Sequence, residues 1–88
     1  MSDVDCFHQL ERGLQDLGLV EDAQWMQRAR TCPYTTSSEM YGELGEAIRR
    51  IYRSIPRESV VSLRHVFSDC EHSVRRAWPG FTLAPDAW

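Results

Sequence analysis

The chain has 88 residues, of which 42% are apolar and 26% are charged, and its formal net charge is −3. This composition fits a single globular domain over residues 1–88; it excludes a disordered chain and argues against a strongly basic nucleic-acid binder. All ten basic residues are arginines and no apolar run approaches 18 residues, which excludes lysine chemistry and a membrane-spanning helix.

The first predicted helix covers residues 3–17. Ser2 or Asp3 can serve as its N-cap, and Gly18 is placed to end it. Its apolar residues recur at helical spacing and form one stripe, made of Phe7, Leu10, Leu14 and Leu17. This stripe predicts an amphipathic helix with one buried face.

The second predicted helix covers residues 20–31 and must end before Pro33. Its apolar residues fall on two opposite sides. Leu19, Ala23 and Met26 form one side, and the other side consists of Trp25, Ala29 and Cys32. Two interpretations follow: either the helix is enclosed on both sides, or Trp25 faces a partner.

The third predicted helix opens with a capping box from Thr36 to Glu39, in which each side chain accepts a hydrogen bond from the other residue's backbone N–H. Glu46 and Arg50 are spaced for an ion pair on this helix. Its apolar face consists of Met40, Leu44, Ala47, Ile48, Ile51 and Ile55.

Pro56 can be the first residue of a fourth helix, which ends at Pro79 and Gly80. Its unbroken stripe consists of Val60, Leu63, Phe67, Cys70, Val74 and Ala77. These elements predict an all-α fold, a single-domain four-helix bundle with antiparallel neighbours and a short apolar C-terminal tail. The tail is expected to fold back over the bundle, with Trp88 as a plug; the alternative is a peptide that docks on another chain.

The cysteines predict packing and not chemistry. They are widely spaced, without a CxxC pair, so that a disulfide framework and a zinc knuckle are disfavoured and buried thiols are expected at Cys6, Cys32 and Cys70. The acidic start of the chain contains no apolar stretch, and the arginine bias points to a GC-rich genome. We therefore expect a bacterial, cytoplasmic protein.

A possible metal site on the fourth helix fails on geometry. His65, Asp69 and His72 share one helix face, but two ligands separated by about 10.5 Å along a helix axis cannot hold the same ion. The sequence also contains no phosphate-binding loop, nucleophile elbow or zinc-protease motif. We expect a solvated polar face here, and no metal, cofactor or catalytic residue in the chain.

Two further features point to contacts. Gly42 and Gly45 interrupt the third helix, where each costs about 1 kcal/mol relative to alanine. Either they permit close approach of another backbone, from this chain or from another, or they only weaken or kink the helix. Residues 1–46 carry most of the acidic side chains and residues 47–88 most of the arginines. If the fold keeps these charges apart, an acidic lobe results that attracts basic partners.

The segment SSEMYGELGEAIRRI, residues 37–51, resembles segments of small bacterial helical proteins, including immunity proteins that accompany interbacterial toxins. The resemblance implies a small cytosolic protein that blocks a toxin by direct binding. It implies no particular functional residue.

The preferred hypothesis is a non-enzymatic protein-binding module, plausibly an immunity or inhibitor protein whose partner is a basic toxin domain. The residues expected to contact the partner are Asp22, Trp25, Glu39, Gly42, Glu43, Gly45 and Glu46. The alternatives are a self-associating helical protein, which dimerises through the glycine face or Trp25, and a nucleic-acid binder that uses the arginines of the third and fourth helices. An enzyme with a site at His65 and Asp69, or at Cys70, is the remaining alternative.

Overall fold

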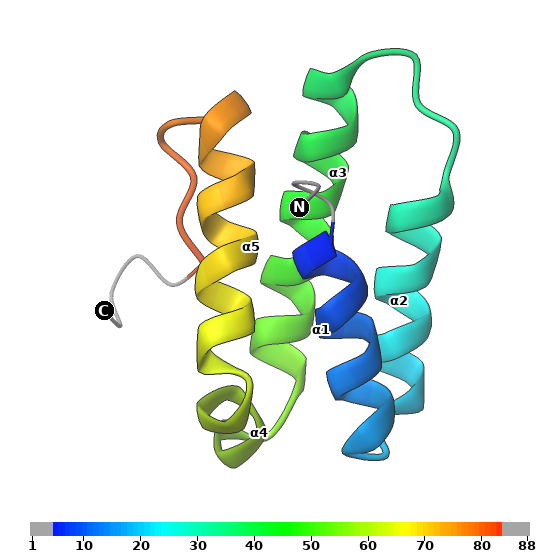
Figure 1. Cartoon of the computed structure of the whole chain (residues 1–88), viewed down its shortest axis with the longest axis vertical. Helices are drawn as coiled ribbons and strands as arrows, with labels where there is room; N and C mark the ends of the chain where they lie inside the picture. Colours follow the sequence, from blue (N-terminus) through cyan, green and yellow to red (C-terminus); the bar gives the residue numbers. More distant parts are fainter. Residues whose placement is uncertain (1–4, 84–88) are drawn as a thin grey trace.

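The computed structural model describes residues 5–83, which form helices and loops without a strand. The helices of this range are α1 (Asp5–Asp16), α2 (Val20–Thr31), α3 (Ser37–Ser54), α4 (Arg57–Ser62) and α5 (Arg64–Ala77). The four longer helices run alternately down and up the long axis (Figure 1). Each packs against its neighbour in the chain and α1 packs against α5, which closes the bundle. The predicted all-α class is confirmed.

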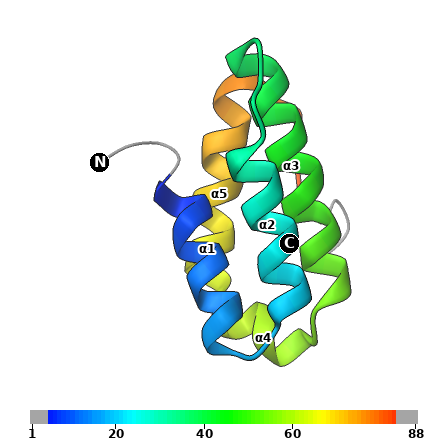
Figure 2. The same ribbon diagram turned by 90° about the vertical axis from the view of Figure 1, so that its right-hand side faces the viewer.

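Figure 2 shows the same helices turned by 90°. One apolar stripe from each long helix is buried in the interior of the bundle. The residues with essentially no exposed surface are Phe7, Leu10, Leu14, Met26, Leu44, Ile48, Ile51, Phe67, Cys70, Val74 and Leu83. On α2 only the side that includes Ala23 and Met26 is buried, so this helix is not enclosed on both sides. Within residues 5–83 no helix combines the length and the apolar character needed to cross a bilayer.

The end of α1 follows the prediction, except at one leucine. Gly18 has a φ of +78°, and its N–H donates to Gln15 O while Leu19 N–H donates to Leu14 O. These two hydrogen bonds form a Schellman motif, which favours glycine because of the positive φ. Leu17, predicted for the core stripe, is 44% exposed because the chain turns there towards α2. The predicted start of this helix and its caps lie outside the described residues.

The capping box of α3 is confirmed on the Thr36 side. Thr36 Oγ1 accepts a hydrogen bond of 3.1 Å from Glu39 N–H, and Thr36 has the extended backbone of an N-cap. The Glu39 carboxylate accepts a hydrogen bond from the Thr35 hydroxyl at 2.8 Å. The start of the longest helix is therefore fixed by short polar side chains of the α2–α3 loop.

The fourth predicted helix is two helices, α4 and α5, and the prediction of one unbroken helix is wrong. The α4 segment contains two valines and two serines, which are weak helix formers. The Ser62 hydroxyl also donates to Glu58 O at 3.1 Å, a bond that bends helices. Leu63 then leaves helical geometry at φ −102° and ψ 16°, while its side chain stays buried.

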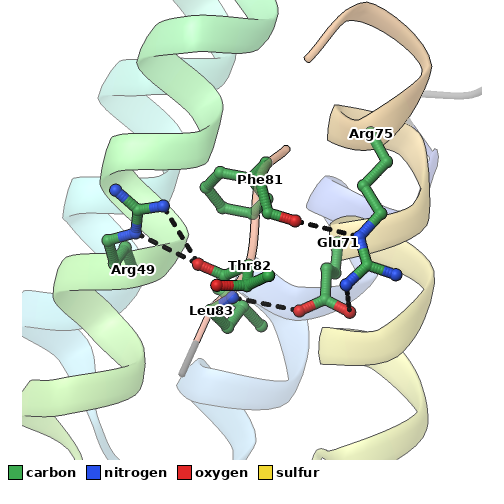
Figure 3. A network of polar contacts seen from close by, with 6 residues as sticks. All are labelled: Arg49, Glu71, Arg75, Phe81, Thr82 and Leu83. Atoms are coloured by element: carbon green, nitrogen blue, oxygen red, sulfur yellow. Dashed lines mark hydrogen bonds and ion pairs between the residues drawn. The ribbon is translucent and has the colours of Figure 1, made fainter. Parts of the chain in front are cut away.

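The C-terminal segment folds back between α3 and α5, as predicted for Phe81 and Leu83, whose side chains are buried. Side chains bind its backbone (Figure 3). Arg49 donates twice to Thr82 O, at 3.0 and 3.3 Å, Arg75 donates to Phe81 O at 2.9 Å, and Glu71 accepts from Leu83 N–H at 3.0 Å. Trp88, the predicted plug, lies outside the described residues.

Arg49→Gln is expected to loosen this segment and to lower the free energy of unfolding by about 1–2 kcal/mol. The change removes the hydrogen bonds to Thr82 O and the guanidinium group that lies 4.7 Å from the centre of the Phe81 ring. Urea unfolding measures the loss, and hydrogen exchange at the Leu83 amide should become faster. Arg53→Gln, on the exposed side of α3, is the matched control. Unchanged exchange at Leu83 would contradict the role given to Arg49.

Candidate functional site

On the outer face of α2 and α3, two arginine side chains contact an exposed aromatic ring. Trp25 on α2 is 38% exposed. Arg50, which projects from α3, places its guanidinium carbon 4.0 Å from the Trp25 ring centre, and Arg28 on α2 places its own at 5.6 Å. Both distances are within the range of cation–π attraction. The indole is therefore held in place although much of it is exposed to water.

A hollow of about 410 Å³ lies beside this indole, and we call it the Trp25 hollow. Its lining residues come from α2, α3 and the loop between them: Trp25, Arg28, Ala29, Cys32, Tyr34, Glu43, Glu46, Ala47 and Arg50. A second hollow of about 370 Å³ adjoins it and shares Glu46 and Arg50, with Arg49, Arg53 and Ser54 as its other lining residues. The α2–α3 face therefore offers a continuous concave surface.

Tyr34 closes the loop end of the Trp25 hollow. Its hydroxyl donates to Ala29 O at 2.8 Å, which ties the loop to the last turn of α2. Burial raises the pKa of Tyr34 to about 12, and Cys32, Glu43 and Glu39 act in the same direction. Since burial favours the neutral phenol, Tyr34 contributes an uncharged, rigid wall.

Three of the predicted contact residues meet at this hollow. Trp25 lies on α2, and Glu43 and Glu46 lie on successive turns of α3. Asp22 and Glu39 do not line it: Asp22 lies in the first turn of α2 and Glu39 in the first turn of α3, where it bonds Thr35. The structure therefore gathers part of the predicted set on one face.

The two glycines of α3 serve packing within the chain. A Cβ atom at Gly45 would lie 3.0 Å from Phe81 and 3.1 Å from Val74, and one at Gly42 would lie 3.5 Å from the Trp78 indole. The groups that approach these glycines are side chains of the same chain, and not the backbone whose approach was predicted. Gly45 is buried, so the glycine face offers no surface for a partner at this position.

Sequence reasoning missed the arginines of this site. It paired Glu46 with Arg50, but Glu46 pairs with Arg49 at 3.3 Å, and Arg50 turns instead to Trp25 on the neighbouring helix. The predicted separation of charges is therefore lost on this face, where two arginines and two glutamates line one hollow. A signal was available in the two-sided pattern of α2, which left Trp25 without a place in the core.

A second group of interacting side chains lies between α1 and α5. Cys6 and Cys70 are buried, as predicted, and their side chains hydrogen-bond each other, while Cys32 is exposed and that prediction is wrong. The hydrogen bond from Cys70 lowers the pKa of Cys6 to about 7, with help from the Ser73 hydroxyl and the Phe7 N–H. The same contact and burial raise the pKa of Cys70 far above its usual range.

Stability is expected to rise with pH between about 7 and 9 because of this pair. The pKa of Cys6 is depressed in the folded chain, so that its thiolate stabilises the fold above the unfolded value of 9.0 and this contribution is lost as pH falls through about 7. Two pKa units correspond to about 2–3 kcal/mol. Above pH 9 the raised pKa of Cys70 acts in the opposite direction. Urea unfolding against pH measures the rise, and it should disappear in Cys6→Ser.

The other candidates for chemistry lie apart. His65, Asp69 and His72 are all exposed on α5. Within residues 5–83, no three metal-binding side chains of the His, Cys, Asp or Glu type come together. Two of the described hollows combine aromatic side chains with charges of both signs: the Trp25 hollow, and a larger one of about 520 Å³ between α3 and α5 that is lined by Gly42, Glu43, Glu46, Arg49, Val74, Trp78, Pro79, Gly80 and Phe81. The α2–α3 face is distinguished by the two arginines that contact one exposed indole.

The chain was compared with protein families, curated proteins and solved structures, and none of the three comparisons finds a match. The functional argument therefore depends on the geometry of the α2–α3 face.

Proposed function

We propose that this chain is a non-enzymatic protein-binding module, which acts as an immunity-type inhibitor by binding a bacterial toxin domain in the cytoplasm. One observation carries the proposal: the exposed Trp25 indole is contacted by Arg28 and Arg50 beside the Trp25 hollow. Tryptophan, tyrosine and arginine are the residue types that contribute most to binding at the centre of protein interfaces. All three types line this hollow.

The Trp25 side chain is already restricted before a partner binds, which supports the proposed binding function. Binding costs conformational entropy whenever it immobilises a mobile side chain, and stacking on Arg50 has already restricted Trp25. Glu43 and Glu46 add carboxylates beside the indole and Arg28 and Arg50 add cations, so the hollow favours a partner that presents complementary charges of both signs. The net charge of −3 favours association with a basic partner at long range.

The proposal is tested by differential capture with matched variants. Immobilised wild-type protein, Trp25→Ala and Val61→Ala are incubated with extract of the cells that make the protein. Val61 is 65% exposed on α4, at one end of the bundle, and serves as the control for a lost apolar group. A protein retained by wild type and Val61→Ala, and lost by Trp25→Ala, is the expected result.

The inhibitor function needs a second readout. The captured protein should arrest growth when it is expressed alone, and growth should return when this chain is co-expressed. If no captured protein distinguishes Trp25→Ala from wild type, the proposed surface is wrong. If wild type is instead a dimer that Trp25→Ala dissociates, self-association replaces the inhibitor function.

A further inference from the structure

Two free thiols, which the proposed function does not use, lie where the first long helix packs against the last. Cys6 is the second residue of α1 and Cys70 lies near the middle of α5, and the two side chains hydrogen-bond each other. Cys6 Sγ also lies 3.5 Å from Ser73 Oγ, one turn beyond Cys70. The two helices are therefore close enough at this point for their sulfur atoms to interact directly.

We propose that Cys6 and Cys70 are an oxidation site, at which hydrogen peroxide reacts with Cys6 and Cys70 completes an intramolecular disulfide. A disulfide requires β-carbons about 3.5–4.5 Å apart. Cys6 Sγ lies 3.5 Å from the hydroxyl of Ser73, which is one turn from Cys70 on α5, so the two thiols are neighbours across the helix pair before any oxidant arrives. Rotation about the side-chain bonds is the movement that remains, because α1 and α5 already pack together.

The reaction balances in two steps. The Cys6 thiolate attacks one oxygen of peroxide, the O–O bond breaks, and hydroxide leaves, so that Cys6 becomes a sulfenic acid. The Cys70 sulfur then attacks the Cys6 sulfur; the S–S bond forms, the S–O bond breaks, and hydroxide leaves with the proton from Cys70 as water. The dithiol loses two electrons, and one peroxide is reduced to two waters.

The surroundings assign different roles to the two sulfurs. Cys6 receives hydrogen bonds from Cys70, Ser73 and the Phe7 N–H in the first turn of a helix, an environment that stabilises a thiolate. Its residual exposure of 9% gives a molecule as small as peroxide a route to the sulfur. Cys70 is fully buried, and its contact with Cys6 together with this burial raises its pKa, so that it holds its proton. Cys6 is therefore the attacked sulfur and Cys70 the resolving one.

The test uses the full chain with Cys32→Ser, which removes the exposed third thiol and leaves the pair. The folded protein is treated with peroxide and unfolded in the presence of N-ethylmaleimide, and its intact mass is measured by mass spectrometry. The expected product is a monomer lighter by two hydrogens, which takes up no maleimide and returns to the reduced mass with a phosphine reductant. Free glutathione serves as the control for the peroxide dose. If the protein takes up two maleimides at a dose that oxidises glutathione, both thiols have stayed reduced and the proposal is wrong. Disulfide-linked dimers as the main product would overturn it as well.

Two further variants separate the roles of the sulfurs. In Cys32→Ser with Cys70→Ala, oxidation should stop at a Cys6 sulfenic acid that a cyclic diketone captures. In Cys32→Ser with Cys6→Ala, Cys70 should resist peroxide while the chain is folded. Equal oxidation of Cys70 with and without Cys6 would reverse the assignment. If Cys70→Ala does not fold, the rate of alkylation of Cys6 in Cys32→Ser decides, because Cys6 should react many times faster than Cys70.

Discussion

Arg30→Met is expected to lower the free energy of unfolding by about 3 kcal/mol, because it leaves the buried Glu11 carboxylate without its partner. Glu11 is only 6% exposed, and its Oε1 atom accepts from Arg30 at 3.0 and 3.1 Å. Without the guanidinium group, a carboxylate remains between α1 and α2 with its charge uncompensated. Removal of one partner from such a pair costs about 3–5 kcal/mol, and partial exposure of Arg30 places this pair at the lower end.

The matched control is the double variant Glu11→Met with Arg30→Met. It replaces both charges by apolar groups of similar length, and it should recover to within about 1 kcal/mol of wild type. Urea unfolding of wild type, both single variants and the double variant gives the interaction energy. If the double variant is no more stable than Arg30→Met, the loss comes from the packing of the Arg30 stem and not from the stranded charge.

The spacing of the apolar residues predicts where the long helices lie and which of their faces are buried. The end of α2 follows from the sequence because Pro33 cannot continue a helix, and the start of α3 follows from the Thr36 cap. The buried face of α3 follows from the spacing of its apolar residues. The break at Leu63 did not follow, since Leu63 keeps the apolar spacing on both sides of it. The break depends on the weak helix formers of α4 and on where the bundle ends, which the period does not encode.

The candidate site was predictable only in part for a similar reason. Trp25 is conspicuous in the sequence because it does not belong to the buried stripe of α2. The identity of the side chain that stacks on it depends on how α2 and α3 cross. Arg49 and Arg50 are adjacent, yet Arg49 turns to the C-terminal segment and Arg50 to Trp25. Rules for pairs within one helix cannot separate these two directions, because both contacts are between elements.

The buried glycine of α3 is a second case in which the sequence indicated a contact but not its partner. The sequence indicated a close approach at Gly45, and the structure assigns it to Phe81 and Val74 of the same chain. The approaching group lies far along the sequence, so its identity required the tertiary fold. The C-terminal segment covers this side of α3 only in part, because a hollow that is lined by Gly42, Trp78 and Phe81 stays open there. The opposite side of α3 faces Trp25.

Trp25→Ala is expected to weaken binding of the captured partner by about 2–4 kcal/mol, which corresponds to roughly a 30- to 1,000-fold increase in Kd. The free energy of unfolding should fall by about 1–2 kcal/mol, because the partly covered indole loses its contacts with Arg28 and Arg50 while the core of the bundle is untouched. Calorimetric titration of purified partner measures the first quantity, and urea unfolding measures the second. The Val61→Ala control should bind like wild type.

Arg50→Gln separates the two ways in which Trp25 can act. If the indole binds strongly because Arg50 holds it in place, then Arg50→Gln should weaken binding by about 0.5–1.5 kcal/mol even though Trp25 is intact. In the Trp25→Ala background the same change should then have a smaller effect, because no indole remains to be held. Additive losses would instead mean that Arg50 contacts the partner independently. An Arg50→Gln variant with wild-type affinity would show that stacking on Arg50 does not prepare Trp25 for binding.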